Sequence, residues 1–348
     1  MGAVDQGHVT LDDVARGAGV SRATASKALN NRSDVAASTR ARVLATSEEL
    51  GYRPALVPAP LPYPSVALVA DNLATFYTLE ILKGAASAAL REGVSLTVSY
   101  TPGTPPGNCP VPLEEAWFDL IHGNRYLGVI VVTTPLSDAQ LAKAHSLGLP
   151  LVAIDPANAL PHGARSIGAT NWNGGVEATQ HLIDLGHRRI AFVRGPAESV
   201  PSGERLQGYL SALQMNDLPV LPELIRGDDF TYETGLEVGR ELLALPPSQR
   251  PTAVFAGADA IALGLYEAAR EAGLSIPGDI SVVGFDDTDM AAWATPRLTT
   301  VHQPLHDMGA AGVRLVVDLA RGGEPSMSGP VRLATTLVRR DSTGPAPS

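Results

Sequence analysis

From residue 65 onward, short apolar runs alternate with longer segments in which apolar residues recur every three or four positions. A short apolar run fits a strand buried on both faces, and the longer repeat fits an amphipathic helix. This alternation predicts parallel sheets covered by helices. The expected strands are residues 65–70, 94–100, 127–133, 149–154, 189–193, 253–256 and 281–285. The expected helices are residues 76–92, 138–147, 175–185, 204–215, 233–245 and 260–272.

So many strands exceed one modest sheet, and two similar lobes are therefore expected. Ligands of such sheets bind beyond the carboxyl ends of the strands. Acidic residues stand at these ends, namely Asp71, Asp155, Asp259, Asp286 and Asp287. The sequence thus predicts an α/β core with a ligand site formed from strand ends.

Ahead of this core, residues 10–30 predict two short helices joined by a tight turn. Thr10 can begin a capping box, and Gly19 can end the first helix because glycine tolerates positive φ. Ser21 can cap the second helix, whose surface side chains are small apart from two cations. Such a helix can enter the major groove of DNA. Any small helical hairpin is the alternative, and the capped pair around a glycine turn favours a helix-turn-helix.

A third helix is expected to complete a headpiece of residues 1–53. It would start at Ser38 or Thr39, turn Val43, Leu44 and Leu50 inward, and stop at Gly51. A linker follows, because five of the eleven residues 54–64 are proline and favour an extended polyproline conformation. The core would then run over residues 65–340, and residues 341–348 are expected to form a disordered tail.

The composition, 45% hydrophobic and 18% charged, fits a globular chain. A cytoplasmic location without an internal disulfide is expected, because Cys109 is the single cysteine and no export signal or membrane-length apolar run is present. The formal net charge is −10, yet residues 1–58 hold seven basic and six acidic residues. So weakly basic a head has little affinity for DNA alone. Two heads on a dimeric body would supply it through effective concentration.

The stretch TLDDVARGAGVSRATASKALN resembles the headpiece signature of the lactose-repressor/galactose-repressor (LacI/GalR) family. Later blocks resemble the effector-binding core of that family in the same order: LGHRRIAFV, ERLQGY, ADAIALG, IPGDISVVGFDD and PRLTTVHQP. The resemblance covers residues 8–338. It implies an all-α helix-turn-helix headpiece and an α/β two-lobed core like periplasmic sugar-binding proteins, with parallel sheets and three crossovers.

The resemblance places the crossovers near Arg165, Pro296 and Met327. The N-terminal lobe would comprise residues 65–165 and 297–326, and the C-terminal lobe residues 166–296 and 327–340. In such a homodimer, an effector bound between the lobes changes the affinity for a pseudo-palindromic operator, which is a coupling between two sites. Repression is favoured over activation by the habit of the family. No cofactor, metal or membrane partner is implied.

The resemblance assigns base reading to Arg22, Ala23 and Lys27. Arg22 can bond guanine in bidentate geometry, Ala23 offers a methyl contact to thymine, and Lys27 can reach a base or a phosphate. Further polar residues can donate to phosphates: Thr10, Ser21, Thr24, Ser26 and Asn30. For Thr10 and Ser21, helix capping alone is the alternative, and both roles can coexist.

The linker departs from the family pattern. Many members have a short helix here that forms on DNA and wedges a leucine into the minor groove. Leu61 falls at the wedge position, but Pro58 and Pro60 occupy what would be the helix. We therefore expect no ordinary hinge helix, weak or absent DNA bending, and effector control through head spacing. A merely longer spacer is the alternative.

Sugar sites combine aromatic faces for C–H groups with acids, amides and arginine for hydroxyls. At matching positions the chain offers Asp71, Asn72, Phe76, Tyr77, Trp172, Arg205, Phe230, Asp259 and Trp293. The family uses the positions of Arg205 and Asp259 to hold a ligand, which makes them the leading candidates. A structural ion pair is the alternative for Arg205, and plain core packing for Phe76 and Phe230.

Two neighbouring features refine this expectation. Asp286 and Asp287 are expected to structure a loop rather than to contact a ligand. Ala258 stands where the family often has asparagine, so one polar contact is missing. Acids, one arginine and several aromatics favour a neutral mono- or disaccharide over a purine or a phosphate.

Three other functional classes fit the sequence less well. An enzyme is disfavoured because nucleotide-binding, serine-hydrolase and zinc-protease motifs are missing and the eight histidines are scattered. A solute-binding protein for transport would suit the core but not the headpiece. The intact Arg22, Lys27 and capping residues argue against a family member that has lost DNA binding.

Overall fold

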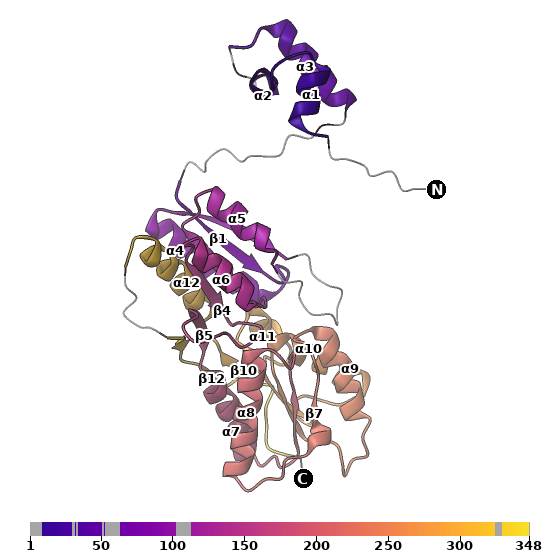
Figure 1. Cartoon of the computed structure of the whole chain (residues 1–348). Coiled ribbons are helices and arrows are strands. Elements are labelled where there is room, and N and C mark those ends of the chain that lie inside the picture. Colours follow the sequence, from indigo (N-terminus) through magenta and orange to yellow (C-terminus); the bar gives the residue numbers. More distant parts are fainter. Residues whose placement is uncertain are drawn as a thin grey trace. The chain divides into compact units, whose positions relative to one another are not determined.

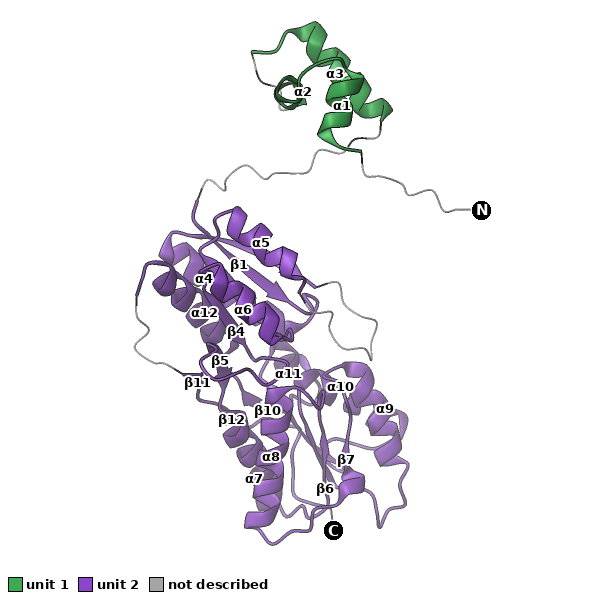
Figure 2. Ribbon diagram, viewed as in Figure 1, with its two compact units in different colours: residues 1–59 green, residues 60–348 purple. Residues whose placement is uncertain are grey.

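The computed structural model divides the chain into two compact units, residues 1–59 and 60–348 (Figure 2). It describes residues 9–29, 32, 34–50, 52, 63–101, 113–323 and 329–347. Most of the proline-rich linker, with Leu61, lies outside the described residues, as do Asn30, Cys109 and Met327. Within the described ranges, no helix is both long enough and apolar enough to cross a membrane.

Unit 1 contains the helices α1 (Leu11–Gly17), α2 (Arg22–Leu29) and α3 (Ala37–Glu49). Thr10 forms the predicted capping box with Asp13, and Gly19 takes a φ of 61° just after α1. The Thr24 backbone N–H donates to Ser21 Oγ at 3.1 Å, so Ser21 caps α2. The local signals for a capped helical pair are therefore confirmed.

The core of unit 1 is built from small side chains: Val14, Ala15, Ala18, Ala25, Ala28, Val35 and Val43. The prediction that Leu44 and Leu50 face inward is wrong, because they are 48% and 40% exposed. Helix α3 buries Val43 and Ser47 instead. These two lie four residues apart on one helical face, and Leu44 is turned about 100° from Val43. The helix also starts at Ala37, slightly before the expected position.

Unit 2 contains two six-stranded sheets with helices on both faces (Figure 1). The first sheet has the order β11-β5-β4-β3-β1-β2, is parallel throughout its printed pairings, and defines the N-lobe. Its strands are β1 (Ser65–Ala70), β2 (Ser95–Tyr100), β3 (Gly128–Val132), β4 (Leu151–Ile154), β5 (Ser166–Ala169) and β11 (Val331–Leu333). Its helices are α4 (Phe76–Glu92) and α12 (Leu305–Ala320) on one face, and α5 (Glu115–Gly123) and α6 (Asp138–Ser146) on the other.

The second sheet, of order β12-β10-β9-β8-β6-β7, defines the C-lobe. Its strands are β6 (Ile190–Val193), β7 (Ile225–Arg226), β8 (Ala253–Ala256), β9 (Ser281–Asp286), β10 (Thr299–His302) and β12 (Thr336–Val338), with β12 antiparallel to β10. Its helices are α7 (Asn171–Asp184) and α8 (Val200–Met215) on one face, and α9 (Tyr232–Leu243) and α10 (Asp259–Glu271) on the other. A 3-10 turn η1 (Pro222–Leu224) precedes β7, and the short helix α11 (Asp289–Trp293) follows β9.

The chain passes between the lobes three times, as predicted, but the crossings lie later than expected. The strand after Arg165 still belongs to the N-lobe sheet, so the first crossing is at Thr170. The strand after Pro296 belongs to the C-lobe sheet, which moves the second crossing to Gln303. The third crossing is at Thr335, between β11 and β12. Short strands that complete each sheet follow the predicted boundaries, and strand ends, not loops, set the crossings.

The tail that was expected to be disordered packs against the C-lobe. Ser342 is fully buried; its Oγ accepts from the Thr299 N–H at 2.8 Å and donates to the Val282 carbonyl at 2.6 Å. The Gly344 N–H donates to Ser281 Oγ at 3.0 Å. The small polar residues that resembled disorder therefore satisfy backbone groups at the amino ends of β9 and β10.

Candidate functional site

Helix α2 turns one face to the core of unit 1 and the other to solvent. Ala25 and Ala28 are buried, whereas Arg22, Ala23 and Lys27 are exposed. The three predicted base-reading residues therefore share a surface that is free of large side chains. Such a surface allows a helix to approach the floor of a major groove.

The predicted phosphate contacts also take part in local structure. The Thr10 hydroxyl donates to Asp13 Oδ2 at 2.7 Å, and Ser21 Oγ lies 2.8 Å from Thr24 Oγ1. Capping, the alternative interpretation for Thr10 and Ser21, is thus present. Ser26 is half-buried on the same helix.

Arg205, on α8, is the centre of a buried polar cluster where the two lobes meet. It is 3% exposed, and its guanidinium donates from Nε to Asn171 Oδ1 at 2.9 Å, from Nη1 to the Gly257 carbonyl at 2.6 Å and from Nη2 to Gln303 Oε1 at 2.7 Å. Its Cζ lies 3.7 Å from the centre of the Phe285 ring. The cation is therefore held in one orientation.

Gln303, at the second crossing, connects this arginine with the N-lobe. Its Nε2 donates to Asp155 Oδ2 at 2.7 Å, and the Tyr77 hydroxyl donates to the same oxygen at 2.8 Å. Burial raises the pKa of Asp155, although the charge of Arg205 and these two donors oppose the shift. One chain of hydrogen bonds thus runs from α8 of the C-lobe to α4 of the N-lobe.

Asp286 ends β9 beside the same arginine. Its Oδ1 lies 3.6 Å from Arg205 Nη1 and is buried without a hydrogen-bond partner among the described residues. Burial raises the pKa of Asp286 well above its ordinary value, and the charge of Arg205 opposes the shift. Its φ of 112° is a conformation that costs about 1–3 kcal/mol in a residue other than glycine. A strained, buried carboxyl group with an unused acceptor is typical of a ligand site.

The loop-structuring role expected for this acidic pair is visible at Asp287. Its Oδ1 accepts from Arg340 Nη2 at 2.6 Å, and its Oδ2 lies 3.0 Å from His302 Nδ1. The two adjacent acids therefore face different partners. Asp286 belongs to the cluster around Arg205, and Asp287 secures the loop.

Asp259 opens α10 and is fully buried. It accepts from Thr300 Oγ1 at 2.6 Å, and from the backbone N–H and hydroxyl of Thr288 at 2.8 and 2.9 Å. Burial raises the pKa of Asp259 to about 7, against the effect of these donors. The recorded bonds join it to the protein itself, so it supports the loop that follows Asp286.

Asp71 and Asn72, at the end of β1, stand apart from the arginine. Asp71 Oδ1 accepts from Thr133 Oγ1 at 2.5 Å. Burial raises the pKa of Asp71 to about 6, and the charge of Asp229 in the C-lobe adds to the shift. Asn72 Oδ1 accepts from the Ala74 N–H at 2.8 Å and so closes a local turn.

Two of the predicted aromatic residues meet across the lobes. Phe76 of α4 and Trp293 of α11 pack edge to face with ring centres 5.6 Å apart, and Trp293 remains 66% exposed. The Phe230 ring lies 5.5 Å from Arg205 Cζ. These contacts place Phe76, Trp293 and Phe230 at the junction of the lobes.

Trp172 is placed differently from expectation. It lies in the first turn of α7 rather than in a loop, and its Nε1 donates to Ser211 Oγ on α8 at 3.2 Å. The residue before it, Asn171, bonds Arg205 instead. Trp293 was also expected in a loop and lies in α11.

The sequence analysis did not select Asp155, Asn171, Asp286 or Gln303 as effector contacts. A signal existed for the two acids, because both follow apolar strands in the way that Asp71 does. Gln303 lies within the PRLTTVHQP block, but its role depends on the position of the second crossing.

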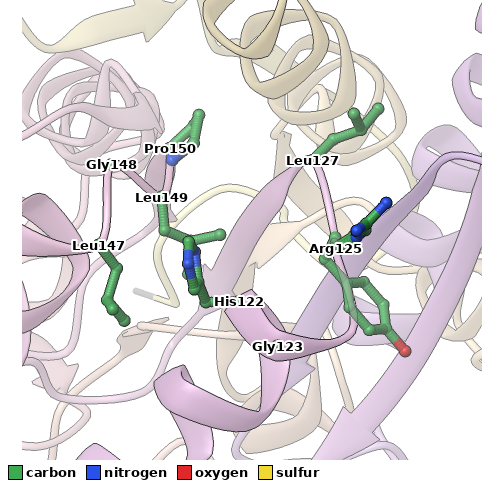
Figure 3. A pocket seen from close by; sticks show the side chains of 9 residues that line it. His122, Gly123, Arg125, Leu127, Leu147, Gly148, Leu149 and Pro150 are labelled. Atoms are coloured by element: carbon green, nitrogen blue, oxygen red, sulfur yellow. The ribbon is translucent and has the colours of Figure 1, made fainter. Parts of the chain in front are cut away.

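A separate pocket of about 520 Å³ lies at the amino ends of β3 and β4 (Figure 3). Residues that line it include His122, Arg125, Leu127, Leu147 and Pro150. It lies at the opposite end of these strands from Asp155, which follows β4. This pocket is therefore distinct from the Arg205 cluster.

Comparisons with known proteins agree with this two-part architecture. Residues 10–55 match the family described as bacterial regulatory proteins, lacI family, and residues 179–343 match a periplasmic binding protein-like domain. Catabolite control protein A of Priestia megaterium is 31% identical over 319 residues, which cover 89% of this chain and 92% of that protein. The chain belongs to the LacI family.

Other LacI-family proteins resemble the chain over most of its length. The HTH-type transcriptional repressor PurR of Proteus mirabilis (strain HI4320) is 33% identical and covers 89% of both chains. A solved complex of the transcriptional regulator CelR with cellobiose is 32% identical, with a TM-score of 0.70 over 96% of this chain and 99% of that one. The lac repressor dimer bound to operator and the anti-inducer ONPF is 31% identical, with a TM-score of 0.69 over 97% and 99%.

Membership of the LacI family settles the broad class. The chain is a DNA-binding transcriptional regulator and not an enzyme. The headpiece and the two-lobed core are those of this family, and the Arg205 cluster lies where the two lobes of the core meet.

Proposed function

We propose that this LacI-family protein is a homodimeric repressor of a pseudo-palindromic operator, and that a small neutral sugar bound between the lobes controls its operator affinity. The observation that carries the effector site is Asp286 Oδ1, a buried acceptor without a hydrogen bond beside Arg205. A hydroxyl group of a ligand would donate to this oxygen.

The charges around the site favour a neutral polyol. Asp71, Asp155 and Asp286 face the junction with Arg205 as the central cation. Sugar hydroxyls both donate to carboxylates and accept from arginine, whereas a phosphate would be repelled by the surplus of acids. The cellobiose bound to CelR supports a mono- or disaccharide.

A homodimer is supported by apolar side chains on the surface of the N-lobe. Leu79 and Leu90 of α4 are 42% and 83% exposed, and Val98 and Tyr100 of β2 are 40% and 59% exposed. Exposed apolar surface of this kind favours burial against a second chain. The lac repressor structure, which is a dimer on operator DNA, supports the same assembly.

The DNA contacts can be tested by selecting preferred duplexes from a random library. Arg22→Ala should relax base preference at one operator position, with a loss of about 1–3 kcal/mol of discrimination there and a smaller loss of general affinity. An unchanged binding motif would reject the assignment of Arg22.

The effector class can be tested by a thermal-shift screen followed by calorimetry. Mono- and disaccharides should raise the melting temperature, because a ligand that binds only the folded state stabilises it. Tight binding confined to purines or to phosphorylated metabolites would overturn the neutral-sugar proposal.

A further inference from the structure

Both long basic side chains of α2 face acids of the headpiece itself. Arg22 Nε lies 3.6 Å from Asp12 Oδ1 of α1, and Lys27 Nζ lies 2.6 Å from Asp34 Oδ2 in the segment before α3. The shorter pair is the stronger, and the hydrogen bond from Lys27 is the main cause that lowers the pKa of Asp34. Asp34 is therefore ionised at neutral pH.

The Lys27–Asp34 pair lies on the exposed face of the headpiece, where its side chains are 54% and 56% exposed. Exposed ion pairs are weak, so DNA can open this one. A DNA phosphate, however, offers Lys27 only another anion in place of the one it already has. Asp34 would also remain close to the phosphates and repel them. Binding through the backbone alone therefore gains little from Lys27.

We propose that Asp34 is a specificity-determining residue that lowers affinity for DNA of arbitrary sequence by holding Lys27 in an intramolecular ion pair. Lys27 leaves the pair where a base edge offers acceptors in the right place, such as guanine O6 and N7. This inference rests on the proposed contact of Lys27 with DNA. It suits a head with only one more basic than acidic residue, because each unpaired cation weighs heavily in non-specific binding.

The test compares Asp34→Asn with Glu49→Gln in the full chain. Glu49 is exposed at the end of α3, and among the described residues it has no printed ion pair with α2, so it gives a matched change of charge. The probes are a duplex that the wild-type protein selects from a random library, and a scrambled duplex of equal length and composition. Affinities are measured by fluorescence anisotropy from low to moderate salt.

Asp34→Asn should bind the scrambled duplex about five-fold tighter at low salt, and the slope of log affinity against log salt should steepen by about 0.9, the value for one phosphate. Affinity for the selected duplex should rise by about two-fold or less, so the specificity ratio falls. Glu49→Gln should raise both affinities equally and by less than about two-fold.

A double mutant separates the ion pair from a general effect of charge or folding. In a Lys27→Gln background, Asp34→Asn should raise the affinity for scrambled DNA no more than Glu49→Gln does. Equal effects of Asp34→Asn and Glu49→Gln in the wild-type background would overturn the inference while leaving operator binding intact. If the wild-type protein selects no duplex at all, the proposed function itself fails.

Discussion

The two lobes share a strand order and carry two helices on each face, yet they contribute unequally to the effector site. The C-lobe supplies Arg205, Asn171 and the strained Asp286, which lie together without help from the other lobe. The N-lobe adds Asp155 and Tyr77, which reach the arginine through a glutamine at a crossing. This difference indicates that one lobe holds a preformed site and the other completes it on closure.

The lobes also differ in how the chain ends. The N-lobe sheet ends in the parallel strand β11, whereas the C-lobe gains the antiparallel β12 and the packed tail after it. The C-lobe therefore has an additional set of hydrogen bonds at the amino ends of its strands. Its greater rigidity would suit the lobe that carries the preformed half of the site.

The largest expected effect comes from removing the cation of the C-lobe. Arg205→Ala leaves buried carboxyl groups without their positive partner and should lower the free energy of unfolding by about 3–5 kcal/mol. Effector binding should become undetectable by calorimetry. Asp155→Asn, on the N-lobe side, keeps most of the hydrogen-bonding geometry and should cost less than half as much stability. Equal losses in the two variants would contradict the asymmetry.

The next effect is a pH dependence confined to the C-lobe. The folded pKa of Asp259, about 7, lies above its ordinary value of 3.8. The folded state therefore holds a proton that the unfolded state releases, so stability falls as pH rises from about 4 to 7 and levels off above that range. Relative to Asp259→Asn, the wild-type protein should lose about 2 kcal/mol between pH 5 and 8 in urea unfolding. A difference that does not change with pH would remove this role.

A smaller effect is expected from the tail. Ser342→Ala removes the acceptor of the buried Thr299 N–H and should lower the free energy of unfolding by about 1–2 kcal/mol. Ser146→Ala, on an exposed helix end of the N-lobe, is the control and should change it by less than about 0.5 kcal/mol. Urea unfolding measures both. Similar values for the two variants would mean that the tail does not stabilise the C-lobe.

The smallest effect should come from the aromatic contact between the lobes. Trp293→Ala removes an edge-to-face pair with Phe76, worth about 0.5–1.5 kcal/mol, and should weaken effector binding several-fold by disfavouring closure. Trp172→Ala removes an indole that bonds within the C-lobe and should leave effector affinity within about two-fold. Calorimetry that ranks these variants in the reverse order would return Trp172 to the site.

Long, strongly patterned elements could be predicted from the sequence, whereas short ones could not. Strand β1 and helix α4 have the predicted bounds, because a continuous apolar run defines the strand and Thr75 and Gly93 mark the ends of the helix. Strands β5, β7 and β10 to β12 have two to four residues each, too few for a periodic signal. These short strands also set the crossings, which explains why the lobe boundaries were misplaced.

The candidate site was predicted where one residue type identifies the chemistry. Arg205 was identified because a buried arginine position is informative by itself. Gln303 and Asn171 were not, because their roles arise from the geometry of a crossing and of a helix start. Asp286 and Asp287 are adjacent and identical in type, and only backbone conformation separates the acid beside Arg205 from the one that bonds Arg340 and His302.

The most direct test is fluorescence anisotropy of a labelled, selected operator duplex with and without saturating sugar, using the wild-type protein and Arg205→Ala in parallel. The account predicts that the sugar changes the operator affinity of the wild-type protein by about five-fold or more and leaves that of Arg205→Ala unchanged. An equal response of the two proteins, or no response to any mono- or disaccharide, would contradict it.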